Sequence, residues 1–268
     1  MITGYQDSRP TRRRGPPGTV TARAGAASPS ETKSDGGKGD PLDLGELSLP
    51  KLTATREVLV NALVELAADT DASSLALGLS AGQSDEIARN AALWTSPTRP
   101  ALERYTGVLF DALDAKSFTR AQKAKALTRL AIGSALFGVV RAGDPIPAYR
   151  LSGGSKLPGM GTLQSVWKPE LTSAVEAEAD GLVVDLRSGT YQQLGPLPGA
   201  VIATVLTEKP DGSRSVVSHF NKHHKGLLAR ALVVSRAEPS DVKGVAKVAA
   251  KAGLRVEIAS QRELIILT

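Results

Sequence analysis

The chain has 268 residues, enough for one large domain or two small ones with a substantial core. It has no cysteine, which excludes disulfides, thiolate metal sites and cysteine nucleophiles. No apolar run approaches the ~20 residues that span a bilayer, and the N-terminus lacks an apolar signal core. We therefore expect a cytoplasmic protein with no membrane partner.

The net charge of +6 is unevenly distributed. Residues 1–25 hold five arginines against one aspartate, a charge of +4, which leaves +2 for the rest of the chain. Between Arg214 and Arg236 there is no acidic residue, and all three histidines fall in this window. The globular part is thus nearly balanced, and this window is its one basic patch.

Residues 1–40 contain almost no large apolar side chains. Such a segment cannot bury enough surface to offset the entropy of ordering. We expect residues 1–27 to form a disordered or atypical tail and residues 28–268 to form a single compact domain.

Apolar spacing in the first half predicts helices. They begin near Thr53 and at Ser84, and two more cover Leu102–Leu113 and Thr119–Ile132, the last with Thr119 as N-cap. The second half alternates, with predicted helices at Leu163–Val175, Lys225–Val234 and Ser240–Ala252.

The predicted strands are Ser134–Val140, Gly181–Leu186, Val201–Thr207, Arg214–Phe220, Leu254–Ile258 and Glu263–Leu267. Turns at Pro210–Ser213 and Ala259–Arg262 predict two hairpins. The fold class is α/β (α+β): a mixed β-sheet with packed helices.

Three strand-like runs end in polar or charged residues. They are Phe137–Leu151, Val183–Tyr191 and Val216–Lys222. Polar groups presented from rigid loops at strand ends indicate one shared site at one edge of a sheet.

These segments resemble the YaaA family of peroxide-stress proteins, also called UPF0246. The resemblance starts at Tyr105-Thr106-Gly107 and covers roughly residues 28 to 268. Its further members are Leu136–Arg141, Asp144, Pro147–Leu151, Trp167, Asp185-Leu186, Ser188, Tyr191, Ser218–Lys222, Lys225-Gly226 and Arg230.

The resemblance implies a cytoplasmic protein that resists hydrogen peroxide by keeping free intracellular iron low. It also implies a compact α/β fold with a helix-hairpin-helix-like element, a positively charged cleft and double-stranded DNA as partner. It carries over no catalytic residues and no cofactor, and we expect a monomer. Leu77–Gly82 is the best local candidate for the helix-hairpin-helix-like turn.

The N-terminus departs from the family pattern. Ser28–Lys33 fits the family's first turn, but Ala22–Ala27 replaces the short apolar strand before it. We hypothesise that Ala22–Ala27 is read in a shifted frame, because codons for these residues can encode Pro-Val-Leu-Val-Leu-Leu one base away. Codons incompatible with that shift would end this hypothesis.

Two sets of residues form the candidate site. The predicted DNA or anion contacts are Lys222, Lys225, Arg230, Arg141, Arg150 and Lys156. The predicted supporting residues of the cleft are Lys33, Asp144, Tyr149, Asp185, Tyr191 and Asn221.

Each assignment has a plainer alternative. Arg141, Asp144 and Arg150 form either an anion site or an internal ion pair. The Ser152–Lys156 loop is either a phosphate nest or a plain loop. Tyr149, Asp185 and Tyr191 serve either acid–base chemistry or buried hydrogen bonds.

A metal site at His219, His223 and His224 is disfavoured, because no carboxylate lies nearby in the chain. The leading functional prediction is a non-enzymatic, DNA-associated protein. The alternative is an enzyme that acts on a nucleotide-like or phosphorylated small molecule in the same cleft.

Overall fold

A mixed β-sheet with a parallel centre organises the protein. The computed structural model describes residues 26–27, 33–216 and 218–268. The strands of the main sheet are β1 (Ala26–Ala27), β3 (Ala131–Ser134), β4 (Gly138–Arg141), β6 (Val184–Leu186), β7 (Val201–Glu208), β8 (Arg214–Ser215), β9 (Arg255–Ser260) and β10 (Glu263–Leu267). Their order is β4-β3-β1-β6-β7-β10-β9, with β8 paired to β7.

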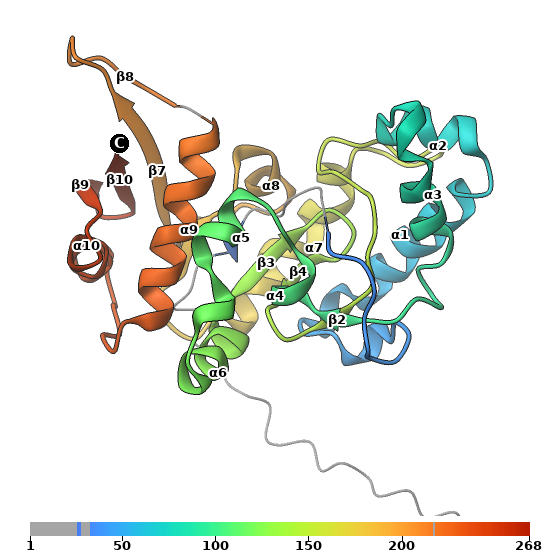
Figure 1. Cartoon of the computed structure of the whole chain (residues 1–268), viewed down its shortest axis with the longest axis horizontal. Helices are drawn as coiled ribbons and strands as arrows, with labels where there is room; N and C mark the ends of the chain where they lie inside the picture. Colours follow the sequence, from blue (N-terminus) through green and yellow to red (C-terminus); the bar gives the residue numbers. More distant parts are fainter. Residues whose placement is uncertain (1–25, 28–32, 217) are drawn as a thin grey trace, which may run out of the picture.

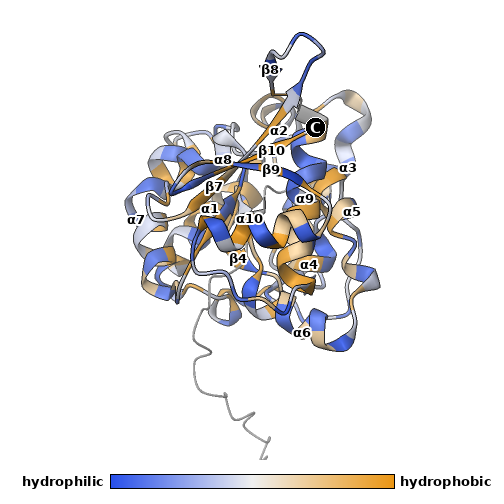
Figure 2. Ribbon diagram, turned by 90° about the vertical axis from the view of Figure 1, so that its left-hand side faces the viewer, coloured by the Kyte–Doolittle hydropathy of each residue, from blue (hydrophilic) through white to orange (hydrophobic). Residues whose placement is uncertain are grey.

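The strands from β3 to β10 in this order are parallel, and β4 and β9 close the two edges antiparallel. The expected α/β fold with a mixed sheet is confirmed. A separate antiparallel pair joins β2 (Arg99–Pro100) to β5 (Pro145–Ile146). Inward residues of β7 and β10 are fully buried, and Figure 2 shows the contrast with the hydrophilic tip of the β7–β8 hairpin.

The helices pack around this sheet and extend it at one end. They are α1 (Thr53–Leu66), α2 (Thr70–Leu77), α3 (Ser84–Ala91), α4 (Ala101–Arg104), α5 (Val108–Leu113), α6 (Arg120–Arg129), α7 (Leu163–Glu178), α8 (Gly189–Leu194), α9 (Ser218–Val234) and α10 (Val242–Lys251). Figure 1 shows α1, α2 and α3 at one end of the molecule and α9, α10 and strands β7, β9 and β10 at the other. No helix in the described part of the chain combines the length and apolar character that a membrane crossing requires.

An interior position of the sheet, between β3 and β6, belongs to the N-terminal segment. Ala26 and Ala27 pair with β3 on one side and β6 on the other. The structure therefore places two residues of the expected tail in the sheet, at the position where the family pattern calls for an apolar strand. The rest of the predicted tail, residues 1–25, lies outside the described residues.

The predicted strand Ser134–Val140 is instead a tight hairpin between β3 and β4. Gly138 has a φ of 72°, a left-handed conformation that favours glycine and turns the chain back. The Ser134 hydroxyl accepts a hydrogen bond from the Phe137 amide (2.9 Å), which closes the turn. Because the apolar run continues through the turn, the sequence pattern gives no sign of this reversal.

The predicted strand Arg214–Phe220 is also wrong beyond Ser215. Only Arg214 and Ser215 pair with β7, and α9 begins at Ser218. Helix α9 approaches α5 closely at Gly226, where a Cβ atom would lie 2.3 Å from the Leu109 carbonyl oxygen. Glycine at this position thus lets α9 lie against α5. The same packing sets the position of Lys225, the residue before Gly226.

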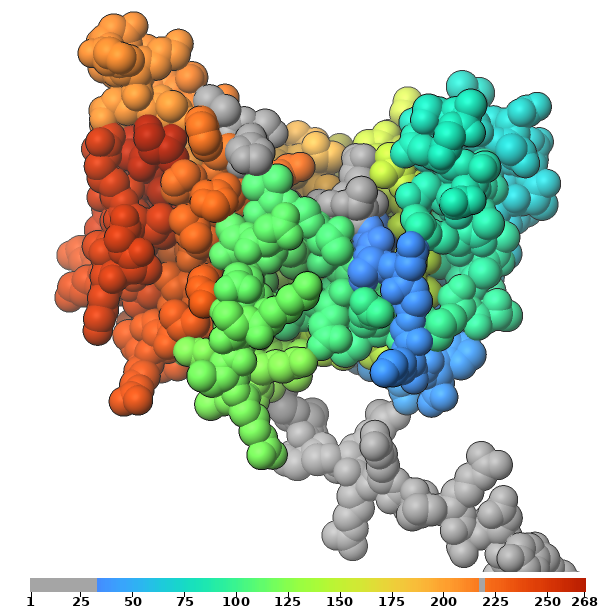
Figure 3. Space-filling view, viewed as in Figure 1, coloured from blue at the N-terminus to red at the C-terminus, as the bar shows by residue number. Residues whose placement is uncertain are grey.

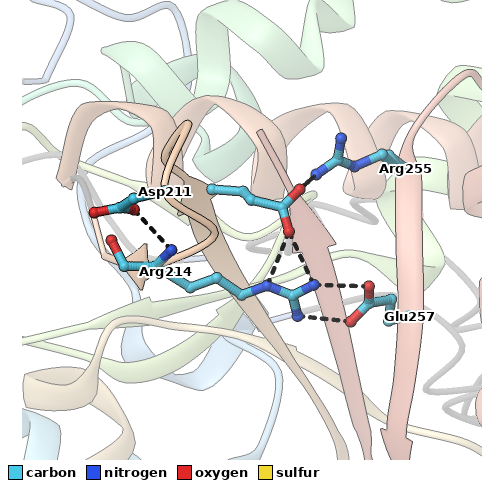
Figure 4. Close-up of polar contacts among 6 residues, drawn as sticks. Asp211, Arg214, Arg255 and Glu257 are labelled. Carbon is cyan, nitrogen blue, oxygen red and sulfur yellow. Dashed lines mark hydrogen bonds and ion pairs between the residues drawn. The ribbon is translucent and has the colours of Figure 1, made fainter.

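A network of exposed ion pairs holds the β7–β8 hairpin against β9. The Arg214 guanidinium lies between the carboxylates of Glu208 (3.1 Å) and Glu257 (2.8 Å), and Arg255 also binds Glu208. Figure 4 shows these groups side by side across the strands. The hairpin turn expected at Pro210–Ser213 is confirmed, and Asp211 accepts the Ser213 amide within it (2.9 Å).

Candidate functional site

The parallel strands β3, β1 and β6 finish side by side at one end of the sheet. We call this end, where their carboxyl ends lie, the carboxyl edge; it is distinct from the outer strands β4 and β9. The chain leaves β1 toward β3 on one side and later returns to β6 on the other. Such a reversal of strand order opens a crevice where ligands bind in open α/β sheets. The carboxyl edge is therefore the candidate site of this fold.

One half of the carboxyl edge is a chain of buried hydroxyls. The Tyr149 hydroxyl lies 2.7 Å from the Ser134 hydroxyl, at the end of β3, and 2.8 Å from the Tyr105 hydroxyl. All three side chains are buried. Burial raises the pKa of Tyr105 to about 12 and that of Tyr149 well above 10, so both remain hydrogen-bond donors at neutral pH.

Lys33 completes this group, which we call the lysine–tyrosine centre: Lys33, Tyr105, Ser134 and Tyr149. The Lys33 ammonium lies 3.9 Å from the centre of the Tyr149 ring and 5.5 Å from that of Tyr105. An isolated bridge pairs Lys33 with Tyr105, which fixes the main chain beside the ring. Lys33 is only 9% exposed, so its charge faces the protein interior.

The other half of the carboxyl edge is built around a buried ion pair at the end of β6. The Arg187 guanidinium donates to both carboxylate oxygens of Asp185 (2.9 and 2.8 Å). It also donates to the carbonyl oxygens of Tyr191 and Gly195 and so fixes α8. Asp185 was a predicted site residue, whereas Arg187 was not. The position of Arg187 two residues after Asp185 was the signal that could have identified it as the partner of that carboxylate.

Lys225 reaches this ion pair from α9. Its ammonium donates to the Arg187 carbonyl oxygen (3.0 Å), and the side chain is buried. Burial lowers the pKa of Lys225 to about 8, and the nearby Asp185 carboxylate offsets only part of that effect. The buried Lys225 amine therefore loses its proton more readily than an exposed lysine does.

The loop after Tyr149 borders the same edge. The Asn90 side-chain amide forms two hydrogen bonds with the Arg150 main chain. Its oxygen accepts the Arg150 N–H (2.8 Å), and its nitrogen donates to the Arg150 carbonyl oxygen (2.9 Å). The Tyr191 hydroxyl accepts the Gly153 N–H (3.2 Å), which ties this loop to α8. The hydroxyls of Ser152 and Ser155 bond each other (3.0 Å). These bonds favour the plain-loop alternative over a phosphate nest.

Arg141 and Asp144 lie away from the carboxyl edge. Arg141 pairs with Ala131 at the start of β3, whereas Ser134 marks its end, roughly 10 Å away at about 3.3 Å per residue. The Arg141 guanidinium binds Glu178 (3.2 Å), and Asp144 accepts the Arg141 amide rather than its side chain. The alternative of an internal ion pair between Arg141 and Asp144 is therefore not what forms here, since the Arg141 side chain pairs with Glu178, and neither residue lies at the carboxyl edge.

The predicted phosphate contacts occupy different environments. Arg230 donates to the carbonyl oxygens of Leu113 and Asp114, at the end of α5. Lys222 and Lys156 are exposed. Asn221 is half-buried on α9, one residue before Lys222. Of the basic set, Lys222 and Lys156 therefore present charge to solvent, while Lys225 presents it inside the protein.

The histidines of α9 form no cluster with carboxylates. The rings of His223 and His224 lie 5.3 Å apart, and the His224 Nδ1 lies 2.9 Å from the Phe220 carbonyl oxygen. Within the described residues no three His, Asp or Glu side chains are grouped as a metal site would need. The side chain of His219 lies outside the described residues.

Figure 3 shows a hollow in the upper outline of the molecule, between the orange and red C-terminal segments and the teal segments that include α2 and α3. The expected helix-hairpin-helix-like turn, Leu77–Gly82, does join two short helices, α2 and α3.

Comparison with known proteins covers nearly the same part of the chain. A family model described as peroxide stress protein YaaA matches residues 26–257. A UPF0246 protein of Corynebacterium efficiens is 53% identical over 239 residues, which cover 88% of this chain and 95% of that protein. A UPF0246 protein of Streptomyces coelicolor is 44% identical over 233 residues, covering 85% of this chain and 90% of the relative.

Proposed function

Because this chain belongs to the YaaA family of peroxide stress proteins, we propose that it acts in the response to hydrogen peroxide and keeps free intracellular iron low. The family match is the observation that carries this proposal. The test is a strain without the gene, assayed for survival in hydrogen peroxide and for free iron by electron paramagnetic resonance. Unchanged survival and unchanged free iron would contradict it.

We further propose that the carboxyl edge binds a small nucleotide-like or phosphorylated molecule and that the protein acts on it as an enzyme. Two buried lysines, Lys33 and Lys225, lie near the ends of β3 and β6, the parallel strands on either side of β1, and buried hydroxyl donors accompany Lys33. Ammonium and hydroxyl donors in a desolvated site suit a compact anion, because a low local dielectric strengthens each contact. The phosphates of a DNA backbone would reach these buried groups less easily than they would reach an exposed basic surface.

Chemistry at this site would depend on Lys225. Its lowered pKa suits a general base or a nucleophilic amine, whereas the raised pKa values of Tyr105 and Tyr149 suit hydrogen-bond donation to an anionic ligand. The Asp185–Arg187 pair would position Lys225, because the Arg187 carbonyl oxygen accepts a hydrogen bond from the Lys225 ammonium.

DNA binding is the second candidate. Exposed Lys222 and Lys156, together with the α2–α3 helix pair, support it. Contacts to phosphates release counterions, so binding through them falls steeply with salt. Lys222→Glu combined with Lys156→Glu should then remove most binding to duplex DNA.

One experiment separates the two candidates. The purified protein is examined by mass spectrometry for copurifying small molecules and titrated with duplex DNA across a salt series. A phosphorylated molecule that is lost in Lys33→Met but kept in Lys222→Glu supports the edge site. Salt-dependent DNA binding that survives Lys33→Met, with no copurifying ligand, overturns it in favour of DNA.

A further inference from the structure

A cavity lies between the last turn of α9 and one face of α10, at the opposite end of α9 from Lys222. Figure 1 shows where these two helices lie in the fold. The volume of the cavity is about 790 Å³, within the range of roughly 300–1,000 Å³ typical of small-molecule sites. It touches none of the residues of the carboxyl edge. The cavity is therefore a separate feature from the site of the proposed function.

The cavity is lined by apolar side chains from both helices. Ala231 and Val234 come from the last turns of α9, and Val248 and Ala252 come from the facing side of α10 and its end. Val234 is an apolar residue that is 36% exposed. An apolar ligand that covered Val234 would remove its side chain from water, while Ala231 and Val248, already buried, form the apolar wall beside it.

Three cations surround this apolar lining: Arg236, Lys247 and Lys251. Lys247 and Lys251 are one helical turn apart on α10, so both face the cavity. Within the part of the chain that the structure describes, none of the three forms an ion pair. Their charges are available to a ligand.

The two carboxylates of the cavity already have partners. Glu238 binds Lys125 (3.4 Å) and Arg129 of α6. Asp241 caps α10 by accepting the Gly244 amide (2.7 Å). The uncompensated charge that the cavity presents to a ligand is therefore positive, and the loop between α9 and α10 is held in place by α6.

We propose that this cavity binds a small amphiphile, with its apolar chain against Val234 and Val248 and its anionic head between Lys247 and Lys251. The head group is a carboxylate or a phosphate, because both anions accept charge-assisted hydrogen bonds from ammonium groups. Charge complementarity excludes a cationic amphiphile of the same length.

Calorimetric titration of the full chain tests the proposal with four probes: decanoate, decyl phosphate, decyltrimethylammonium and acetate. We expect decanoate or decyl phosphate to bind and the other two not to bind. The tighter of the two anions identifies the head group. Binding of neither anion, or equal binding of the cationic probe, would overturn the proposal.

Variants locate the bound probe. Lys247→Gln with Lys251→Gln should weaken binding at least tenfold, and Val234→Glu should abolish it. Lys243→Gln is the matched control, because Lys243 lies on the same helix but does not line the cavity. Equal binding by the control and the double variant would place the probe elsewhere and refute the site.

Discussion

The carboxyl edge and the β7–β8 hairpin both pair arginine with carboxylates, but in opposite surroundings. Asp185 and Arg187 are 3% and 1% exposed, whereas Glu257 and Arg214 are 47% and 33% exposed. In the exposed network the carboxylates' pKa values fall because the arginines donate to them directly, as at Glu208 and Glu257. At the carboxyl edge burial has the largest effect and lowers the pKa of Lys225, which disfavours its charged form.

This difference separates structural charge from functional charge. An exposed pair exchanges water for a partner at nearly equal free energy, so it tolerates change. A buried charge is costly and persists only where its geometry is satisfied or where the shifted pKa serves a function. Changes to the two regions should therefore differ in size and in pH dependence.

The largest effect is expected for Asp185→Asn. Breaking a buried pair leaves the Arg187 charge uncompensated and should cost about 3–5 kcal/mol of unfolding free energy. Urea denaturation at pH 7 measures the loss, with Glu257→Gln as the exposed counterpart. Equal losses for both variants would remove the distinction between the two regions.

A second prediction concerns the pH dependence that Lys225 imparts. Its folded pKa of about 8 lies below the ordinary 10.5, so the unfolded chain holds this proton more tightly. The charge thus destabilises the fold at and below pH 8, and this penalty is relieved as pH rises from 8 toward 10.5. The full interval corresponds to about 3 kcal/mol at 1.4 kcal/mol per pH unit.

Lys225→Met should abolish this contribution. Urea denaturation at several pH values from 7 to 10 gives the unfolding free energy of both proteins. The unfolding free energy of the protein with Lys225 should rise with pH relative to that of the variant. A difference that stays constant with pH would show that Lys225 keeps an ordinary pKa in the folded protein.

A smaller loss is expected for Tyr149→Phe. The variant removes the hydroxyl between Tyr105 and Ser134 and leaves two buried polar groups with one partner fewer, at a cost of about 1–3 kcal/mol. Tyr105→Phe removes only the end of the chain and keeps the Tyr149–Ser134 bond, so it should cost less. Thermal unfolding followed by circular dichroism ranks the two; the reverse order would contradict the hydroxyl chain.

The smallest effect is expected in the exposed network. Arg214→Gln should leave the urea midpoint nearly unchanged, and any shift should shrink in 1 M salt, because exposed charges are screened. A large loss that persists in salt would show that this network is a structural centre.

Much of the fold could be predicted from sequence because local signals agree with it. The capping box of Thr119 and Gln122 starts α6 as expected, and the Pro210–Ser213 turn joins two strands. Where tertiary packing decides, local signals failed. The sequence around Phe220 has β propensity, yet α9 begins there because its next turns pack against α5.

The site was predicted in part. Tyr149, Asp185, Tyr191 and Lys225 were expected at one edge, and the structure places them around the ends of β3 and β6. Arg141 was misplaced because the β3–β4 reversal sends it to the other edge. Arg187 escaped notice since a sequence does not show that a charge is buried.

The most direct test of the account uses a strain without this gene, complemented with single variants and challenged with hydrogen peroxide. We predict that Lys33→Met and Lys225→Met, confirmed as folded by circular dichroism, fail to restore survival. Lys222→Met and Lys156→Met, which change exposed lysines, should restore it fully. Survival restored by the two buried-lysine variants and lost with the two exposed ones would contradict the assignment of function to the carboxyl edge.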